Sequence, residues 1–190
     1  MLDFNQWRER YAHSPESVVN QFLSQLEQLS PETRRAVMAS HPEKEALFKS
    51  YRPSLRLNDT PLTGIPYVLQ DLFDVRGMVT TCGAPFSEPF EIIADESSLL
   101  AEELDHLGAC CFGKTMPAEF GYGLRGRNRS YGNCPHARGL SLVCGGGAGS
   151  TAFSVYNGFA PLGFGLDGNG GMRLPAALHG LFGFRMAKIT

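Results

Sequence analysis

Hydrophobic side chains in the first sixty residues recur at helical spacing. Residues 14–16 form a typical helix start, with a serine before the helix, a proline in its first turn and a glutamate after it. A second start of the same kind lies at residues 30–32, and the proline at position 42 should interrupt that helix before another begins. The apolar positions after the first start share one helical face: Val18, Val19, Phe22, Leu23 and Leu26. We therefore predict that residues 1–60 form a helical segment that packs on the core and covers a sheet.

After residue 60 the pattern changes to short apolar runs. Residues 67–69 (YVL) and 110–112 (CCF) are continuous apolar runs too short for helices, so we interpret them as buried strands. Residues 95–109 have helical spacing, and four leucines are expected to face inward: Leu99, Leu100, Leu104 and Leu107. We expect residues 61–190 to form the core of a single domain together with the N-terminal segment.

Glycine dominates the last part of the chain, because residues 139–184 hold 13 of its 22 glycines. Glycine permits positive φ angles and close backbone approach, so this stretch predicts tight loops whose N–H groups converge on one place. Two stretches match nucleotide-binding patterns: residues 108–115 fit GxxxxGKT, and residues 163–168 fit GxGxxG. Neither is expected to be followed by a helix, so we do not interpret either as a phosphate-binding loop.

The overall charge and composition exclude several classes of function. A net charge of −2 provides no electrostatic attraction to nucleic acid or to an anionic membrane surface. The sequence contains no signal-peptide pattern and no apolar run of membrane-spanning length, so we expect a cytoplasmic protein without membrane contacts. The five cysteines are an odd number without a CxxC pair, which favours reduced thiols over a disulfide framework. Cys134, His136 and Cys144 match no common zinc spacing, and we expect neither a metal nor a cofactor.

Three segments together resemble the amidase signature family. Residues 145–152 (GGGAGSTA) and 165–177 (GLDGNGGMRLPAA) are similar to the family motifs GGSSGGSA and GTDTGGSIRIPAA. Residues 61–86 are similar to a third family segment, PLHGIPVAVKDNIDVAGVPTTAGS. The resemblance runs from about Ser14 to Lys188. It implies an α/β fold, a mixed sheet flanked by helices, corresponding to the N-terminal half of family members that are typically over twice as long.

The resemblance places the family's three catalytic positions on residues that cannot perform its chemistry. The general base, a lysine in the family, falls on Gln70; the bridging serine falls on Gly147 and the nucleophilic serine on Gly171. The family mechanism needs one hydroxyl to attack a carbonyl, a second to relay the proton and a neutral amine to receive it. A glutamine amide does not titrate near neutral pH, and glycine has no hydroxyl. We therefore predict no catalytic residue at these positions.

The resemblance leaves a frame that would bind without reacting. The turn that forms the family's oxyanion hole corresponds to Asp167, Gly168, Asn169, Gly170 and Arg173. Its N–H groups would hold a small amide or carboxylate ligand. Because the family's second half does not follow, an exposed sheet edge is also expected to pair with a protein partner or with a second copy of the chain.

Three interpretations of function stay open from the sequence. The first is a degenerate, non-catalytic amidase-like domain that binds a partner chain or an amide-like ligand. The second is an amide hydrolase with a displaced nucleophile, for which Cys144, Ser150 and Thr151 are the candidates. The third is a shortened gene product without chemistry of its own. If the frame is intact, restoring Lys, Ser and Ser at the three positions should keep the scaffold folded and return weak amidase activity.

Overall fold

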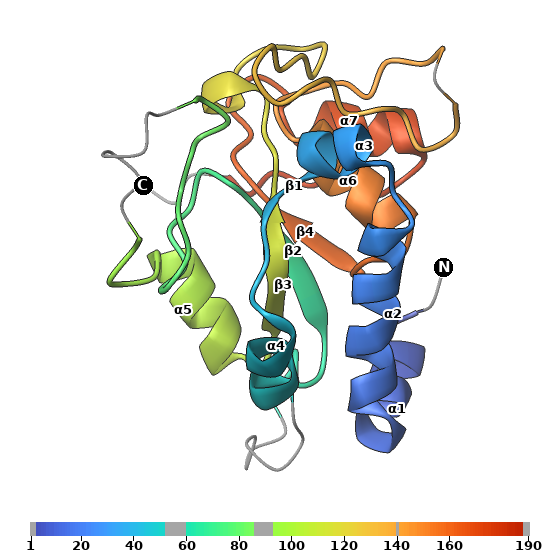
Figure 1. The fold of residues 1–190 in the computed structure, drawn as a ribbon, viewed down its shortest axis with the longest axis vertical. Coiled ribbons are helices and arrows are strands. Elements are labelled where there is room, and N and C mark those ends of the chain that lie inside the picture. The colour runs from blue at the N-terminus through green and yellow to red at the C-terminus, as the bar shows by residue number, and fades with distance from the viewer. Residues whose placement is uncertain (1–2, 52–59, 86–92, 140, 188–190) are drawn as a thin grey trace.

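The structure is a computed structural model that describes residues 3–51, 60–85, 93–139 and 141–187. Helices and strands are mixed along the chain, as Figure 1 shows. In chain order they are α1 (Phe4–His13), α2 (Pro15–Glu27), α3 (Pro31–Val37), β1 (Met38–Ser40), α4 (Lys44–Ser50), β2 (Pro66–Gln70), α5 (Leu99–His106), β3 (Cys110–Thr115), the 3-10 turn η3 (Glu119–Gly121), α6 (Gly149–Tyr156), β4 (Leu162–Phe164) and α7 (Arg173–His179).

The strands form one mixed, four-stranded sheet with the order β1-β3-β2-β4. β2 runs parallel to both of its neighbours, and β1 is antiparallel to β3. Gln70, the last residue of β2, pairs with Thr115, the last residue of β3, so the carboxyl ends of these two parallel strands lie side by side. The expected α/β fold with a mixed sheet flanked by helices is confirmed.

Helices cover the sheet on both faces, with α5 on one side and α1 and α2 on the other (Figure 1). The side chain of Phe112 in β3 is fully buried against Phe22 of α2, with 5.2 Å between the ring centroids. On the opposite face, Leu69 of β2 packs in a cluster with Ala101 and Leu104 of α5. Because side chains alternate across a strand, β2 and β3 bury residues on both faces, which is typical of strands at the centre of a sheet.

The predicted helix starts are confirmed, and one strand in the N-terminal segment was missed. α2 and α3 begin at Pro15 and Pro31, and the Ser30 side chain caps α3 by accepting a hydrogen bond from the Thr33 amide. The expectation that residues 1–60 are helical is wrong for β1, in which Met38 pairs with Thr115. This three-residue strand has no periodicity of its own and is specified by pairing with β3.

The inward face of α5 also differs from the expectation. Leu99 is 79% exposed and Leu107 is 39% exposed, whereas Ala101 and Leu104 are buried. The helix begins at Leu99 and not near residue 95, and Leu107 is its C-cap. Leu99 therefore lies in the first turn, away from the face that Leu104 buries, and the predicted four-leucine face is wrong at both of its ends.

In the described ranges, no helix combines the length and the hydropathy needed to cross a membrane.

Candidate functional site

The three positions that match the family's catalytic residues lie in one neighbourhood. The Gln70 side chain is fully buried, and its Nε2 donates to the Gly147 carbonyl at 2.9 Å. Its Oε1 accepts from the Leu166 amide at 2.8 Å. The Gly171 carbonyl accepts from the Ala148 amide at 3.1 Å. One glutamine thus connects the end of β2 to both glycine-rich segments.

Gly147 has no space for a side chain. A Cβ atom at this position would lie 2.0 Å from the carbonyl oxygen of Gly121 and 3.1 Å from its Cα. The backbone of η3 reaches this place through two residues with positive φ, Phe120 at 53° and Gly121 at 68°. The Ala118 amide donates to the Gly147 carbonyl at 3.0 Å and holds the two segments together. Main-chain atoms therefore fill the space that a side chain at Gly147 would need.

Gly171 is less restricted. A Cβ atom there would lie 3.0 Å from the Leu166 carbonyl oxygen and 3.7 Å from the Gly147 nitrogen. A side chain would require a shift of a few tenths of an ångström in one neighbour. The two glycines thus differ: Gly147 has no space for a side chain, whereas Gly171 could accept one after a small shift of a neighbour.

The turn before α7 is ordered by Asp167. One carboxylate oxygen accepts from the Gly170 amide at 2.8 Å, and the other accepts from Arg173 Nε at 2.8 Å and from its backbone amide at 3.1 Å. The hydrogen bond from the Arg173 guanidinium and those from the two backbone amides hold the pKa of Asp167 well below its usual range. Gly168 and Asn169 are exposed at the tip. The Gly170 N–H therefore faces the carboxylate, and the exposed tip is the part of the turn open to a ligand.

The candidate hydroxyl nucleophiles are buried and already hydrogen-bonded. Ser150 Oγ donates to the Met116 carbonyl, and Thr151 Oγ1 lies 2.6 Å from Thr115 Oγ1. The exposed fractions of Ser150 and Thr151 are 0% and 1%. Neither hydroxyl reaches solvent, so neither is placed to attack a substrate.

Cys144 has the chemistry of a nucleophile but little exposure. Its Sγ lies 3.5 Å from Cys134 Sγ, and its exposed fraction is 3%. The hydrogen bond between the two thiols is the main cause that lowers the pKa of Cys144 to about 6; burial opposes this shift, and His179 reinforces it. Sequence reasoning named Cys144 but could not show that His179 comes close to it.

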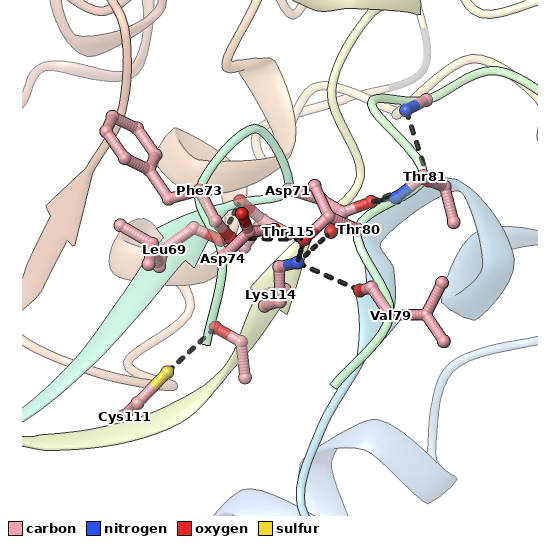
Figure 2. Close-up of polar contacts among 12 residues, drawn as sticks. Leu69, Asp71, Phe73, Asp74, Val79, Thr80, Thr81, Cys111, Lys114 and Thr115 are labelled. Carbon is pink, nitrogen blue, oxygen red and sulfur yellow. Dashed lines mark hydrogen bonds and ion pairs between the residues drawn. The ribbon is translucent and has the colours of Figure 1, made fainter. Parts of the chain in front are cut away.

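Sequence reasoning also missed a buried charged cluster beside the site, which Figure 2 shows. Lys114 Nζ lies 2.6 Å from Asp71 Oδ1, and both side chains are fully buried. The same ammonium donates to the Val79 carbonyl at 2.9 Å and to Thr80 Oγ1 at 2.5 Å. The second oxygen of Asp71 accepts from the Thr81 amide and hydroxyl at 2.9 and 2.6 Å. The signal that points to this cluster is a lysine two residues after the predicted buried strand at residues 110–112, because a lysine that is buried requires such a partner.

Lys114 belongs to the GxxxxGKT match, and the structure shows why that match has no phosphate-binding role. Gly113, Lys114 and Thr115 all lie within β3, so no loop cradles a ligand here. The lysine is directed into the protein toward Asp71. Among the residues that the structure describes, no group of three or more His, Cys, Asp or Glu side chains is arranged to hold a metal ion.

Comparison with known proteins identifies the family. The family model described as Amidase matches residues 17–187. A glutamyl-tRNA(Gln) amidotransferase subunit of Halorhodospira halophila is 31% identical over 173 residues, which are 90% of this chain and 35% of that protein. Translocon at the outer membrane of chloroplasts 64 of Pisum sativum is 34% identical over 129 residues, which are 66% of this chain and 21% of that protein.

The comparison with solved structures agrees. The structure of an S177A variant of Kluyveromyces lactis allophanate hydrolase superimposes with a TM-score of 0.79 at 27% identity, covering 93% of this chain and 29% of that one. The chain spans about a third of the length of relatives such as the amidotransferase protein. The match of the family model over nearly the whole chain, with the two glycine-rich segments placed around Gln70, shows that this chain belongs to the amidase family.

Proposed function

We propose that this chain is a non-catalytic amidase-signature domain that acts by binding a protein partner. The observation that carries the proposal is the closed position at Gly147, where the Gly121 carbonyl occupies the space of a side chain. An enzyme of this family needs a hydroxyl there to relay a proton. Backbone atoms fill that space here. A proton relay at this position is therefore prevented both by the missing hydroxyl and by a packed main-chain segment.

The state of Gln70 supports the same conclusion. Both polar ends of its amide are used, one by the Gly147 carbonyl and one by the Leu166 amide. The amide is a structural link between two loops and has no proton to accept near neutral pH. A lysine at this position would keep the hydrogen bond to Gly147 but would leave the Leu166 N–H facing a cation. The local structure therefore suits the glutamine and disfavours the family's base.

The binding part of the proposal rests on exposed apolar surface near the C-terminal end. Phe182, Phe184 and Met186 are 109%, 82% and 75% exposed in the segment that follows α7. β4 is an edge strand of the sheet, with β2 as its one neighbour among the described strands. Adjacent exposed aromatic side chains and a sheet edge are features of surfaces that associate with another chain.

The names of relatives are compatible with a binding role. One relative is named as a subunit of an amidotransferase, and another is named as part of a translocon. A domain of this family therefore occurs in proteins that are named for assembly with others. A small amide or carboxylate at the tip of the Gly168–Gly171 turn is a further ligand that this proposal allows.

Amide hydrolysis by the purified chain tests the non-catalytic part. Ammonia release from a panel of primary amides should not exceed that of a heat-denatured sample, while an active family amidase, assayed in parallel, turns over the same panel. Turnover that disappears in Cys144→Ser would overturn the proposal in favour of the displaced nucleophile. Turnover that survives in Cys144→Ser would overturn it in favour of chemistry from the binding loop alone.

Light scattering coupled to size exclusion tests the binding part, with a second copy as the first partner to examine. We expect a species larger than the 20.7 kDa monomer for the native chain and a shift toward monomer for the Phe182→Ser/Phe184→Ser variant. Tyr122→Ser is the matched control, because that aromatic residue is 84% exposed in a different loop. A monodisperse native monomer would exclude self-association and leave a different chain as the partner.

A further inference from the structure

A cluster of two thiols and two imidazoles lies outside the family's catalytic positions. Cys134 and Cys144 have their sulfur atoms 3.5 Å apart. The rings of His136 and His179 stack with centroids 4.0 Å apart and planes inclined by 11°. These residues come from the loop that precedes the first glycine segment, from the start of that segment and from the end of α7. The cluster therefore joins parts of the chain that lie far apart in the sequence.

The histidines are held by the main chain and are not available to a metal. His136 Nδ1 accepts from the backbone amide two residues later at 3.0 Å, so its Nε2–H donates to the Leu178 carbonyl at 3.0 Å. His179 Nδ1 donates to the Pro175 carbonyl at 2.8 Å, and its Nε2 accepts from the Ala137 amide at 3.3 Å. Every nitrogen of these two rings has a backbone partner, and zinc would need an unshared lone pair from each histidine. The two thiols are thus not half of a zinc site.

The thiols have the geometry and the unequal acidity of a reactive pair. A disulfide bond is about 2.05 Å long, so the two sulfur atoms need to approach by roughly 1.5 Å. Cys134 is half-buried, and Cys144 is buried. Burial raises the pKa of Cys134, whereas the hydrogen bond between the two thiols lowers the pKa of Cys144 to about 6. Of the two thiols, Cys144 is therefore the more acidic and the better nucleophile.

We propose that Cys134 and Cys144 are a redox modification site that forms a reversible disulfide with hydrogen peroxide as the oxidant. The Cys144 thiolate attacks one peroxide oxygen, the O–O bond breaks, and the departing hydroxide takes up a proton and leaves as water. The Cys144 sulfur is now a sulfenic acid. The Cys134 thiol attacks this sulfur, the S–S bond forms, and the sulfenic oxygen leaves as water with the proton of Cys134. In total, two thiols lose two electrons and two protons, and one peroxide becomes two waters.

The position of Cys144 connects this site to the glycine segment. Cys144 comes directly before Gly145, and the next residue, Gly146, packs so closely that a Cβ atom there would lie 2.5 Å from the Gly171 carbonyl oxygen. A movement of Cys144 toward Cys134 would displace the backbone at Gly145 and Gly146, which is closely packed. Oxidation should therefore change the packing of Gly146 against Gly171, whether or not the chain hydrolyses amides.

Mass spectrometry of the native chain after peroxide treatment tests the proposal. We expect loss of two hydrogen atoms, a cross-linked peptide containing Cys134 and Cys144, and full reversal by dithiothreitol. The pair should oxidise about tenfold faster than Cys111, whose pKa is raised to about 12, chiefly by burial. Cys82→Ser is the control, because it removes a half-buried thiol outside the cluster and should leave the cross-link unchanged.

The Cys134→Ser variant tests whether Cys144 is the thiol that reacts first with peroxide. In Cys134→Ser the reaction should stop at the Cys144 sulfenic acid, which dimedone traps, and no cross-linked peptide should form. If this variant does not fold, hydrogen exchange of the native chain before and after peroxide replaces it, with a change expected at residues 145–147. Cross-links between other cysteines, or a Cys144 sulfinic acid formed in the native chain without a disulfide, would overturn the proposal.

Discussion

Two neighbouring residues at the end of β2 each belong to a buried polar cluster, and one cluster is charged whereas the other is neutral. Asp71 forms an ion pair with Lys114, completed by the Thr80 hydroxyl and by the Thr81 amide and hydroxyl (Figure 2). Gln70 makes two neutral hydrogen bonds, to the Gly147 carbonyl and from the Leu166 amide. The three central side chains are fully buried, and each has its polar partners within its own cluster. The difference is that one cluster retains full charges and the other, around Gln70, has none.

This difference shows that the two clusters hold the fold together in different ways. A buried ion pair is costly to desolvate and persists where further hydrogen bonds satisfy both partners, as they do around Lys114. The charged cluster connects β3 to the end of β2 and to the loop at residues 79–81. The neutral cluster connects β2 to the glycine segments and leaves no group that titrates near pH 7. Under the proposed non-catalytic function, the chain keeps the interactions that hold the fold and lacks those that would move a proton.

Removing the ammonium of the charged cluster should have the largest effect. Lys114→Met leaves the Asp71 carboxylate buried with donors from Thr81 alone, and the expected loss in the free energy of unfolding is about 3–5 kcal/mol. Urea denaturation measures it. The matched control is Lys49→Met, an exposed lysine of α4, which should change stability by less than about 0.5 kcal/mol. A loss below about 1 kcal/mol for Lys114→Met would show that the ion pair does not hold the frame.

The next comparison contrasts the two glycines that replace the family's serines. Gly147→Ala should cost about 3 kcal/mol, because its Cβ meets the Gly121 backbone at 2.0 Å and η3 must move. Gly171→Ala should cost less than about 1 kcal/mol, because a shift of a few tenths of an ångström at the Leu166 carbonyl makes room. Urea denaturation of both variants measures the difference, and faster amide exchange at residues 120–122 should accompany only the first. Equal costs would contradict the closed position at Gly147.

This pair of variants also changes the expectation for restoring activity. From sequence, all three side chains can be returned to a scaffold that stays folded. The structure places the obstacle at Gly147→Ser, since the space for that side chain is filled by Gly121. A restored enzyme would need η3 to be rebuilt together with the three substitutions.

Sequence patterns predicted the elements of the fold that are determined by residues close together in the chain. Proline and serine at helix starts determine α2 and α3, and continuous apolar runs identify β2 and β3. β1 could not be predicted, because three residues without periodicity become a strand only by pairing with β3. The inward face of α5 was wrong at Leu99 and Leu107, because the helix begins at Leu99 and Leu107 is its C-cap, so both lie at the ends of the helix.

The residues named for the candidate site lie close together, but the contacts around them could not be predicted. The resemblance to the family named Gln70, Gly147 and Gly171, and in the structure these three residues lie close together. The carbonyl of Gly121 beside Gly147 depends on the path of a loop, which the sequence does not encode in any short pattern. The approach of His179 to Cys144 depends equally on tertiary packing.

Breaking the neutral cluster should have a smaller effect than breaking the charged one. Gln70→Leu keeps the size of the side chain but leaves the Leu166 N–H without a partner, at an expected cost of about 1–3 kcal/mol. The Gly147 carbonyl loses less, since the Ala118 amide still donates to it. Urea denaturation and the exchange rate of the Leu166 amide are the measurements. Gln28→Leu, an exposed glutamine at the end of α2, serves as the control and should be nearly neutral.

The smallest effect is expected at the turn before α7, where charge stays at the surface. Arg173 holds the pKa of Asp167 below its usual range, so the folded chain releases this proton more readily than the unfolded chain. The resulting stabilisation is present above the unfolded pKa of about 3.9 and is lost as the pH falls toward the folded value. Asp167→Asn should therefore cost less than about 1 kcal/mol at pH 7, and the difference from the native chain should shrink below about pH 4.

Urea midpoints at pH 7 and pH 3 measure this difference, and amide exchange at Gly170 and Arg173 locates it. These two amides donate to the carboxylate in the native chain, so both should exchange faster in Asp167→Asn at pH 7. A difference that grows as the pH falls would have the wrong sign and would mean that another group holds the turn. A difference that stays constant with pH would mean that the hydrogen bonds of Asp167 stabilise the turn and that its charge does not. Only the expected narrowing attributes the order of this turn to the ionised carboxylate of Asp167.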